Sequence, residues 1–324
     1  MAKSIESVLA NPDNVFTKEY KNIIIPTRPA KAWSVTSSGI LMLNTNLGIG
    51  GYPRGRLIEI YGLESSGKTT IALYALLEAQ MENLPCAYVD MEHALDVYYA
   101  QKIGIDIEKW MFVQPDYGEQ ALDFVADAIK NGIKFIVVDS VASLIPKAQI
   151  ERSVEDNFIG LLARNMSQAI PKLEVLAAKN NATVIFINQI REKIGVVYGN
   201  PETTPGGHAL KFYSSIRLET RKGAEIKNDG IVTGQISLIR IKKNKLCAKG
   251  PETQITVIHG SGLNLLEGIV DAGTNLQIIK KSGSWYSYGD TKLGQGKDSV
   301  IELFKDNKEL VTEIQNKITA KLVS

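Results

Sequence analysis

The sequence has few of the residues that secreted, zinc-binding or membrane proteins depend on. Among 324 residues only 2 cysteines and 3 histidines occur, which argues against a disulfide framework and against a zinc site. No apolar run approaches the roughly 18 residues that cross a bilayer. The first residues, MAKSIES, contain no apolar stretch of the kind that a signal peptide carries. We therefore expect a cytoplasmic protein without a membrane partner.

Composition and length fit a globular chain with no extreme bias. The hydrophobic share is 44%, the charged share is 22% and the formal net charge is +2. The length allows one large core and a smaller second domain. The charge is unevenly distributed, because residues 240–249 (RIKKNKLCAK) carry several cations and no acid. Since most basic runs are simply solvated surface, this segment alone does not identify a partner.

Apolar strand-like runs alternate with segments of helical periodicity through the middle of the chain. Strands are predicted at 57–61, 86–90, 135–139, 183–188 and 215–219, with helical spacing around 121–129 and 161–176. Strands that are apolar throughout predict an α/β fold with a mostly parallel sheet covered on both faces. Further strands are expected at 233–242 and 252–259. Beyond residue 262, shorter helices at 264–272 and 298–310 predict a small C-terminal α+β domain.

A phosphate-binding loop lies between the first of these strands and a predicted helix. Residues 62–70 (GLESSGKTT) fit the pattern G-x-x-x-x-G-K-[ST]. Its glycines allow several backbone N–H groups to face one phosphate cluster, beside the positive end of the helix. Lys68 is expected to reach the β- and γ-phosphates and Thr69 to bind Mg²⁺. The motif comprises Gly62, Leu63, Glu64, Ser65, Ser66, Gly67, Lys68, Thr69 and Thr70. The chain is therefore predicted to bind a nucleoside triphosphate.

Polar side chains follow other predicted strands at the same edge of the sheet, where open α/β folds bind ligands. Asp139 ends the run FIVVD and is expected to hold Mg²⁺ directly or through water. Asp90 and Glu92 follow the second strand, and either could orient the water that attacks the γ-phosphate. The pattern does not choose between them. Gln189 could bind the γ-phosphate and act as a switch, although a polar residue that merely starts a loop is commoner.

The segment that follows Gln189 has the composition of a nucleic-acid contact. Residues 190–210 (IREKIGVVYGNPETTPGGHAL) combine glycines and prolines with Arg191, Lys193 and Tyr198. A loop of about 20 residues inside a compact domain is normally functional or disordered. Cations beside an aromatic side chain favour a segment that orders on a nucleic-acid backbone. Residues 150–158 (IERSVEDNF) are acidic, so composition would not make them a DNA contact.

Several long motifs, taken together, resemble the bacterial RecA recombinase family. They are YGLESSGKTT, YVDMEHALD, VVDSVASLIPKAQIE, FINQIREKIGVVYGNPETTPGGHALKFYSS, KKNK and GSWYSYGDTKLGQGK, in order between about residues 41 and 304. The resemblance implies a RecA-type ATPase that uses ATP and Mg²⁺. It also implies polymerisation on single-stranded DNA as a helical filament, an open assembly. Strand exchange with double-stranded DNA, and LexA-type repressors as further partners, are implied as well.

The resemblance also implies roles for individual residues of the nucleotide site. It assigns activation of the attacking water to Glu92, which settles the choice that the pattern left open. It assigns adenine contacts to Asp96 and to Tyr99, whose ring would stack on the base. Ser140 joins the metal motif, and Gln189 becomes the sensor of the γ-phosphate.

Between subunits and on DNA the resemblance implies a further set of residues. Lys243 and Lys245 would reach the ATP of the neighbouring subunit, as an arginine finger does. Lys211 and Phe212 would lie at the same interface. The lysines 280, 281 and 297 resemble a secondary duplex-DNA surface. The expected DNA contacts are Arg152, Arg164, Arg191, Lys193, Ile194, Gly195, Tyr198, Gly206 and Gly207.

On this basis we predict an oligomerisation arm at 1–38, an ATPase core at 39–264 and a DNA-binding accessory domain at 265–324. The arm does not resemble the long first helix of the family, and the tail KITAKLVS lacks the family's common acidic run. Weaker autoinhibition of duplex binding is therefore expected. Two other functions share this core: a ring-forming helicase or repair ATPase, and a DNA-binding filament protein that holds ATP without useful hydrolysis. The loop GNPETTPGG and the pair in KKNK argue against the first, and Glu92 argues against the second.

Overall fold

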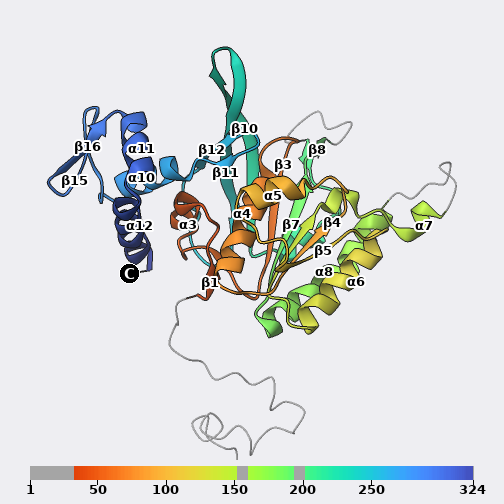
Figure 1. Ribbon diagram of the computed structural model, residues 1–324. Helices are drawn as coiled ribbons and strands as arrows, with labels where there is room; N and C mark the ends of the chain where they lie inside the picture. Colours follow the sequence, from red (N-terminus) through yellow and green to blue (C-terminus); the bar gives the residue numbers. More distant parts are fainter. Residues whose placement is uncertain (1–32, 152–159, 193–200, 324) are drawn as a thin grey trace, which may run out of the picture. The chain divides into compact units, whose positions relative to one another are not determined.

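Figure 1 shows the computed structural model of the chain, which describes residues 33–151, 160–192 and 201–323. From Ser34 onward the described residues belong to one compact unit. The predicted arm 1–38 falls almost entirely outside them; its described end includes the short strand β1 (Val35–Thr36), paired with β2 (Tyr52–Pro53). None of the described helices is long and apolar enough to cross a bilayer.

A nine-stranded sheet forms the centre of this unit, in the order β13-β12-β11-β10-β3-β7-β6-β4-β5. From β10 to β5 all neighbours are parallel, and from β10 to β13 they are antiparallel. The prediction of a mostly parallel sheet is confirmed. The strands are β3 (Leu57–Gly62), β4 (Cys86–Asp90), β5 (Trp110–Val113), β6 (Phe135–Asp139), β7 (Thr183–Gln189), β10 (Ile216–Asn228), β11 (Ile231–Asn244), β12 (Thr253–Ile258) and β13 (Gly262–Leu263).

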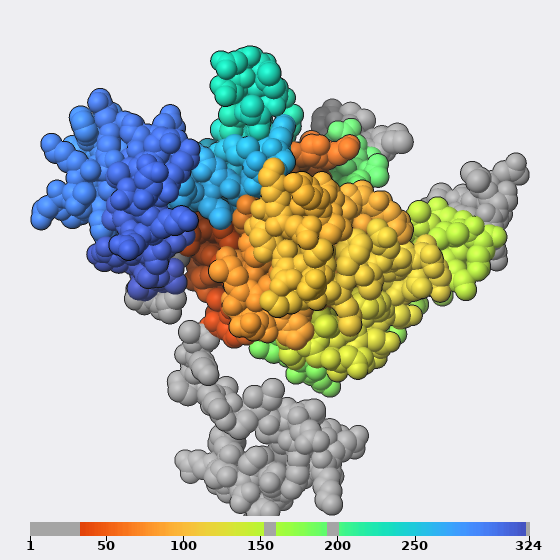
Figure 2. Space-filling model, viewed as in Figure 1, coloured from red at the N-terminus to blue at the C-terminus, as the bar shows by residue number. Residues whose placement is uncertain are grey.

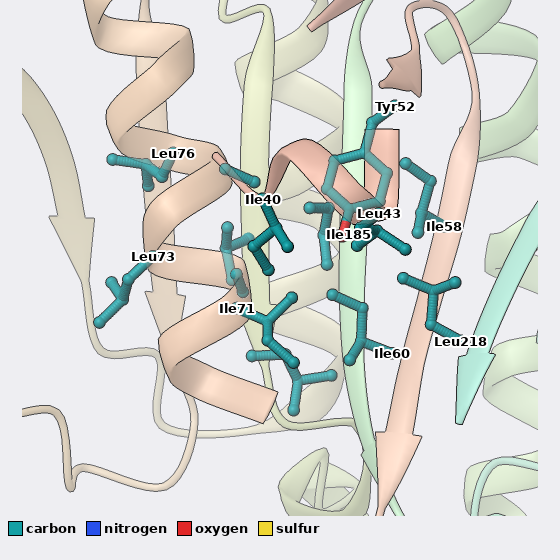
Figure 3. Close-up of a cluster of buried hydrophobic side chains, with 14 of the residues drawn as sticks. Ile40, Leu43, Tyr52, Ile58, Ile60, Ile71, Leu73, Leu76, Ile185 and Leu218 are labelled. Atoms are coloured by element: carbon teal, nitrogen blue, oxygen red, sulfur yellow. The ribbon is translucent and has the colours of Figure 1, made fainter. Parts of the chain in front are cut away.

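Helices cover both faces of this sheet, as the apolar strands require. On one face α3 (Leu41–Leu47) and α4 (Lys68–Met81) pack against Ile58 and Ile60 of β3 (Figure 3). On the other face α6 (Gly118–Lys130) and α8 (Leu161–Asn180) pack against Leu57, the neighbour of Ile58. Successive residues of a strand point to opposite faces, so a single strand contributes to both cores. The remaining helices of the sheet region are α5 (Val97–Lys102), α7 (Lys147–Ile150), α9 (Ala209–Tyr213) and the 3-10 turn η2 (Val141–Ser143).

The C-terminal segment builds a separate small core. A three-stranded sheet of β14 (Lys280–Ser282), β15 (Trp285–Tyr288) and β16 (Thr291–Gln295) packs with three helices around Phe304 and Ile314. The helices are α10 (Leu265–Asn275), α11 (Lys297–Asp306) and α12 (Lys308–Val323). The predicted helix at 298–310 is wrong at its end, because α11 stops before Asn307, whose extended φ of −123° breaks the helix.

Strands β10 and β11 continue past the sheet as a two-stranded hairpin. β10 pairs with β3 only as far as Thr220, and β11 pairs with β12 only from Gly234 onward. Asp229 and Gly230 turn the chain with positive φ values of 50° and 81°, as a tight two-residue turn requires. The outer half therefore projects from the surface (Figures 1 and 2).

Candidate nucleotide site and DNA loops

The phosphate loop joins the carboxyl end of β3 to the start of α4, in the context that the motif requires. At Gly62 a side chain has no room, since a Cβ atom would lie 2.2 Å from Oγ1 of Thr220. Gly67 has a φ of +87° and leads directly into the helix at Lys68. Nζ of Lys68 donates to the carbonyl of Leu63 at 2.7 Å, across the loop. Burial lowers the pKa of Lys68, and the negative charges of neighbouring carboxylates oppose this shift.

Two predicted metal ligands, Thr69 and Asp139, are brought together. Oγ1 of Thr69 donates to Oδ2 of Asp139 at 2.8 Å. Burial raises the pKa of the Asp139 carboxyl to about 6, although hydrogen bonds from Tyr88 and Thr69 pull it down. A hydroxyl and a buried carboxylate at this distance fit Mg²⁺, which prefers oxygen ligands, and a bound cation would favour the ionised carboxylate.

The structure separates the two carboxylates that the sequence pattern could not. Asp90 is buried, and its oxygens accept hydrogen bonds from the side chain of Gln114 at 3.0 Å and the backbone N–H of Leu95 at 3.3 Å. Glu92 is exposed, and its Oε1 accepts hydrogen bonds from the Ser140 hydroxyl and the Gln189 side chain. Asp90 therefore holds its own loop, whereas Glu92 remains open to a solvent molecule beside the phosphate loop.

Gln189 connects this carboxylate to the start of the predicted DNA loop. Its Nε2 donates to Oε1 of Glu92 at 2.9 Å, and its Oε1 accepts from the guanidinium of Arg191 at 3.2 Å. A single amide thus joins the end of β7 to the segment that follows β4 on one side and to the start of the predicted DNA loop on the other. Any movement of Gln189 changes both contacts.

The predicted adenine contacts lie beside the end of the phosphate loop. Asp96 caps the first turn of α5, because its Oδ1 accepts the backbone N–H of Tyr99 at 3.1 Å. The hydroxyl of Tyr99 lies 3.1 Å from Oγ1 of Thr70. Part of the Tyr99 ring packs against the core on the α4 face. The cap and this hydroxyl contact together fix where Tyr99 lies relative to the loop.

The described DNA-loop residues lie around the start of α8. Arg164 is exposed in the first turn of that helix. Gly206 and Gly207 have positive φ values and pack so closely that a Cβ atom would meet Val141 at 3.0 Å and Ala163 at 2.9 Å. The second loop therefore returns to the core beside the helix that carries Arg164. The other predicted contacts lie outside the described residues: Arg152, Lys193, Ile194, Gly195 and Tyr198.

Lys243 and Lys245 hold the end of α9, a helix that also carries two predicted interface residues, Lys211 and Phe212. Nζ of Lys243 donates to the carbonyls of Lys211 and Phe212 at 2.8 and 2.7 Å, and Nζ of Lys245 lies 3.4 Å from the carbonyl of Tyr213. Burial, followed by the nearby cation Lys245, lowers the pKa of Lys243 to about 8. The Phe212 side chain is 66% exposed, unusual for so large an apolar group, and is available for a contact between subunits.

Strand register places Lys243 away from the phosphate loop of its own chain. Gly62 is level with Thr220, whereas Glu59 is level with Arg217, which pairs in turn with Lys243. At about 3.3 Å per residue and about 4.8 Å per strand, Lys243 lies roughly 10 Å back along the sheet and roughly 10 Å to its side. Its ammonium group is bound to α9 as well. Lys243 is therefore not placed to contact a phosphate bound at the loop of its own chain.

The C-terminal lysines divide into two kinds. Lys280 and Lys281 are exposed on β14. Lys297 forms ion pairs with Glu267 at 3.2 Å and Asp271 at 2.8 Å on α10, so its charge is used inside the small domain. The secondary DNA surface stays a prediction for the first pair and is less suited to Lys297.

Three residues that contact the site were missed at the level of sequence. Tyr88 donates to Asp139, Thr220 lies 2.6 Å from the Ser66 hydroxyl, and Gln235 donates to the Ser65 carbonyl. A polar-tipped residue in the otherwise apolar strand beside Asp139 was a usable signal for Tyr88. For Thr220 and Gln235 no signal exists, because strand pairing alone brings β10 and β11 under the loop.

We expect Gln235→Met to raise the dissociation constant for ADP about fivefold. This factor corresponds to the free energy of the one hydrogen bond to the loop that the substitution removes. Methionine keeps the length and packing but cannot donate to Ser65. Ser237→Ala is the matched control, since this serine lies two residues along on β11, faces Gly67, and its buried hydroxyl has no hydrogen-bond partner among the described residues. Equilibrium binding of a fluorescent ADP analogue measures both; equal affinities in all three proteins would show that Gln235 has no such role.

Comparison with known proteins agrees with this geometry. The family model described as RecA N-terminal domain matches residues 3–264, and that described as RecA C-terminal domain matches residues 267–323. Similar curated proteins are named Protein RecA. That of Bacillus subtilis (strain 168) is 50% identical over 286 residues, covering 88% of this chain and 82% of the relative. That of Porphyromonas gingivalis (strain ATCC 33277) is also 50% identical, with coverages of 88% and 84%.

Another relative covers nearly the whole chain. Protein RecA of Staphylococcus epidermidis (strain ATCC 35984) is 44% identical over 321 residues, which are 99% of this chain and 92% of the relative. Family models thus match both parts of the chain. An identity of 44% over 321 residues is far above what unrelated sequences share by chance. The chain belongs to the RecA family.

Proposed function

We propose that this chain is a DNA-dependent ATPase that polymerises on single-stranded DNA and carries out homologous pairing and strand exchange in recombinational repair. Family membership supports recombination and repair as the setting. The single observation that carries the coupled mechanism is the chain of contacts from Glu92 through Gln189 to Arg191. It links a carboxylate beside the phosphate loop to the segment predicted to bind DNA.

The nucleotide is held by the phosphate loop and by the residues at its ends. Backbone N–H groups of the loop and the start of α4 receive the phosphates, and Lys68 supplies a positive charge when it leaves the carbonyl of Leu63. Thr69 and Asp139 would hold Mg²⁺, which neutralises charge on the β- and γ-phosphates when bound. Tyr99 would stack on the base, with Asp96 fixing the helix that carries it.

Hydrolysis requires a water molecule aimed at the γ-phosphorus. Glu92 is the exposed carboxylate beside the loop, and as a general base it would orient this water and take its proton. The hydrogen bonds from Ser140 and Gln189 hold Oε1 of Glu92 and leave Oε2 for the water. The carboxylate is thus positioned before the substrate arrives.

Gln189 would report phosphate occupancy to the DNA loop. Its amide now bonds to Glu92 and to Arg191; a γ-phosphate that competes for the amide would move both contacts. Because linkage is reciprocal, DNA that reorganises Arg191 must in turn alter the nucleotide site. This coupling would make the rate of hydrolysis depend on DNA.

Each nucleotide site would be completed by the next subunit of a filament. Lys243 and Lys245 lie too far from their own phosphate loop, and both are held by carbonyls of α9. ATP of a neighbour would draw them away from these carbonyls and use their charge to stabilise the transferring phosphoryl group. Double-stranded DNA, LexA-type repressors and a cytoplasmic location are further parts of the proposal.

The test is the rate of ATP hydrolysis with and without single-stranded DNA, followed by strand exchange between circular single-stranded and linear duplex DNA. We expect DNA to stimulate hydrolysis strongly and ATP to be required for exchange. Electron micrographs of the DNA complex are expected to contain helical filaments. Hydrolysis that is indifferent to DNA would contradict the coupled mechanism, and closed rings would favour a helicase-like ATPase.

A further inference from the structure

A buried tyrosine contacts the carboxylate of the metal motif. Oη of Tyr88 donates to Oδ2 of Asp139 at 2.7 Å, and its side chain is fully buried. Oγ1 of Thr69 donates to the same oxygen at 2.8 Å. Two donors therefore converge on one carboxylate oxygen, and no hydrogen bond from a described residue reaches the other oxygen, Oδ1.

The ring of Tyr88 is held independently of this contact. It lies on β4 between strand neighbours, with the rings of Trp110 and Phe112 on β5 at centroid distances of 5.7 and 6.2 Å. The ring also belongs to the core on the α4 face of the sheet. A side chain so packed has lost its rotational freedom on folding, so its hydroxyl holds Asp139 at little further entropic cost.

We propose that Tyr88 is a positioning residue for the metal site: its hydroxyl holds Oδ2 of Asp139 so that Oδ1 is directed to a bound Mg²⁺ or to the water in the metal's shell. This inference depends on the proposed function, in which Mg²⁺ accompanies the nucleotide. Groups that orient a metal ligand commonly change metal affinity without touching the metal. The phosphate loop itself does not include Tyr88, so nucleotide affinity without metal stays unchanged.

A second buried tyrosine provides a control, because it distinguishes a hydroxyl that holds Asp139 from one that is merely buried. Tyr52 is also fully buried in the same core, near Leu43 and Ile58 (Figure 3). Its hydroxyl has no hydrogen-bond partner among the described residues. Tyr52→Phe therefore removes the same atom as Tyr88→Phe without affecting Asp139.

The experiment measures ADP affinity of full-length wild type, Tyr88→Phe and Tyr52→Phe by fluorescence, first in EDTA and then during a titration with MgCl₂. We expect the Mg²⁺ concentration at half-effect to rise about tenfold in Tyr88→Phe, with unchanged affinity in EDTA. Tyr52→Phe is expected to match wild type. In ATP hydrolysis, excess Mg²⁺ is expected to restore the kcat of Tyr88→Phe, since only metal occupancy is affected.

The proposal is overturned if the Mg²⁺ concentration at half-effect is the same in Tyr88→Phe as in wild type. It is also overturned if this concentration shifts equally in Tyr88→Phe and Tyr52→Phe, because an equal shift would reflect only the loss of a hydroxyl from the core. A thermal melt confirms that each variant is folded. If the ADP affinity of wild type did not depend on Mg²⁺, the metal would have no place in the proposed function. The assignment of Tyr88 would then fail as well. If Mg²⁺ changed the ADP affinity of wild type and the titration of Tyr88→Phe were the same, only the role of Tyr88 would be refuted, and the proposed function would stand.

Discussion

Lys243→Ala is expected to lower DNA-stimulated ATP hydrolysis about 1,000-fold, the usual effect of removing a cation that stabilises a transferring phosphoryl group. ADP affinity of the isolated subunit is expected to stay as in wild type, because register places Lys243 away from its own phosphate loop. Steady-state hydrolysis and ADP binding measure the two quantities. Lys242→Ala is the matched control: this lysine is adjacent on β11 and its ammonium group pairs with Glu219 at 3.5 Å.

Mixing two inactive variants tests whether the lysine acts across the interface. Lys243→Ala retains Glu92, and Glu92→Gln retains Lys243, so a Lys243→Ala subunit facing a Glu92→Gln neighbour has one complete site. Random assembly of equal amounts makes about a quarter of the interfaces complete, and activity is expected to recover to that order. A mixture that stays inactive, while both variants still coat DNA, would show that Lys243 acts within its own subunit or only supports α9.

Glu92→Gln is expected to reduce DNA-stimulated hydrolysis by about 100- to 10,000-fold, since glutamine cannot take a proton from the attacking water. Nucleotide and DNA binding are expected to persist, because the side chain keeps its size and lies exposed beside the loop. Single-turnover hydrolysis with excess protein measures the chemical step, and a filter-binding assay measures DNA binding.

Asp90→Asn separates the two carboxylates that follow β4. Asp90 accepts hydrogen bonds from Gln114 and Leu95 in a buried position, so its loss is expected to lower the thermal unfolding midpoint. If Asp90→Asn remained folded yet lost hydrolysis while Glu92→Gln kept it, the assignment of the general base would be reversed.

The local sequence was sufficient to predict an element wherever a short segment determines its own backbone conformation. The phosphate loop was predictable because Gly62 and Gly67 are needed at its two bends and strand and helix flank it. The parallel strands β3, β4, β6 and β7 were predictable because each is an apolar run buried on both faces. The strand β5 was missed because it is only four residues long, lies at the edge of the sheet and is only partly buried.

The C-terminal region was less predictable for a related reason. Helices were expected at 264–272 and 298–310, but α12 was missed. The strands β14, β15 and β16 were missed as well, because they are short and largely exposed and are stabilised by each other and by a small core around Phe304. The end of α11 at Asp306 was also missed, since nothing in the local pattern breaks the helical spacing there. Such elements form only when their partners are present.

The sequence by itself determined the α/β class, the phosphate loop, the strand-end carboxylates and, through its long motifs, the family. The resemblance implied Glu92 as the base, but only the tertiary structure gave the physical difference, because Asp90 is buried and Glu92 is exposed although their local patterns are alike. The tertiary structure alone placed Lys243 away from its own loop, and Tyr88 and Gln235 against the site. The reason is physical: a motif specifies backbone over a few residues, whereas register and packing join residues that lie far apart in the chain.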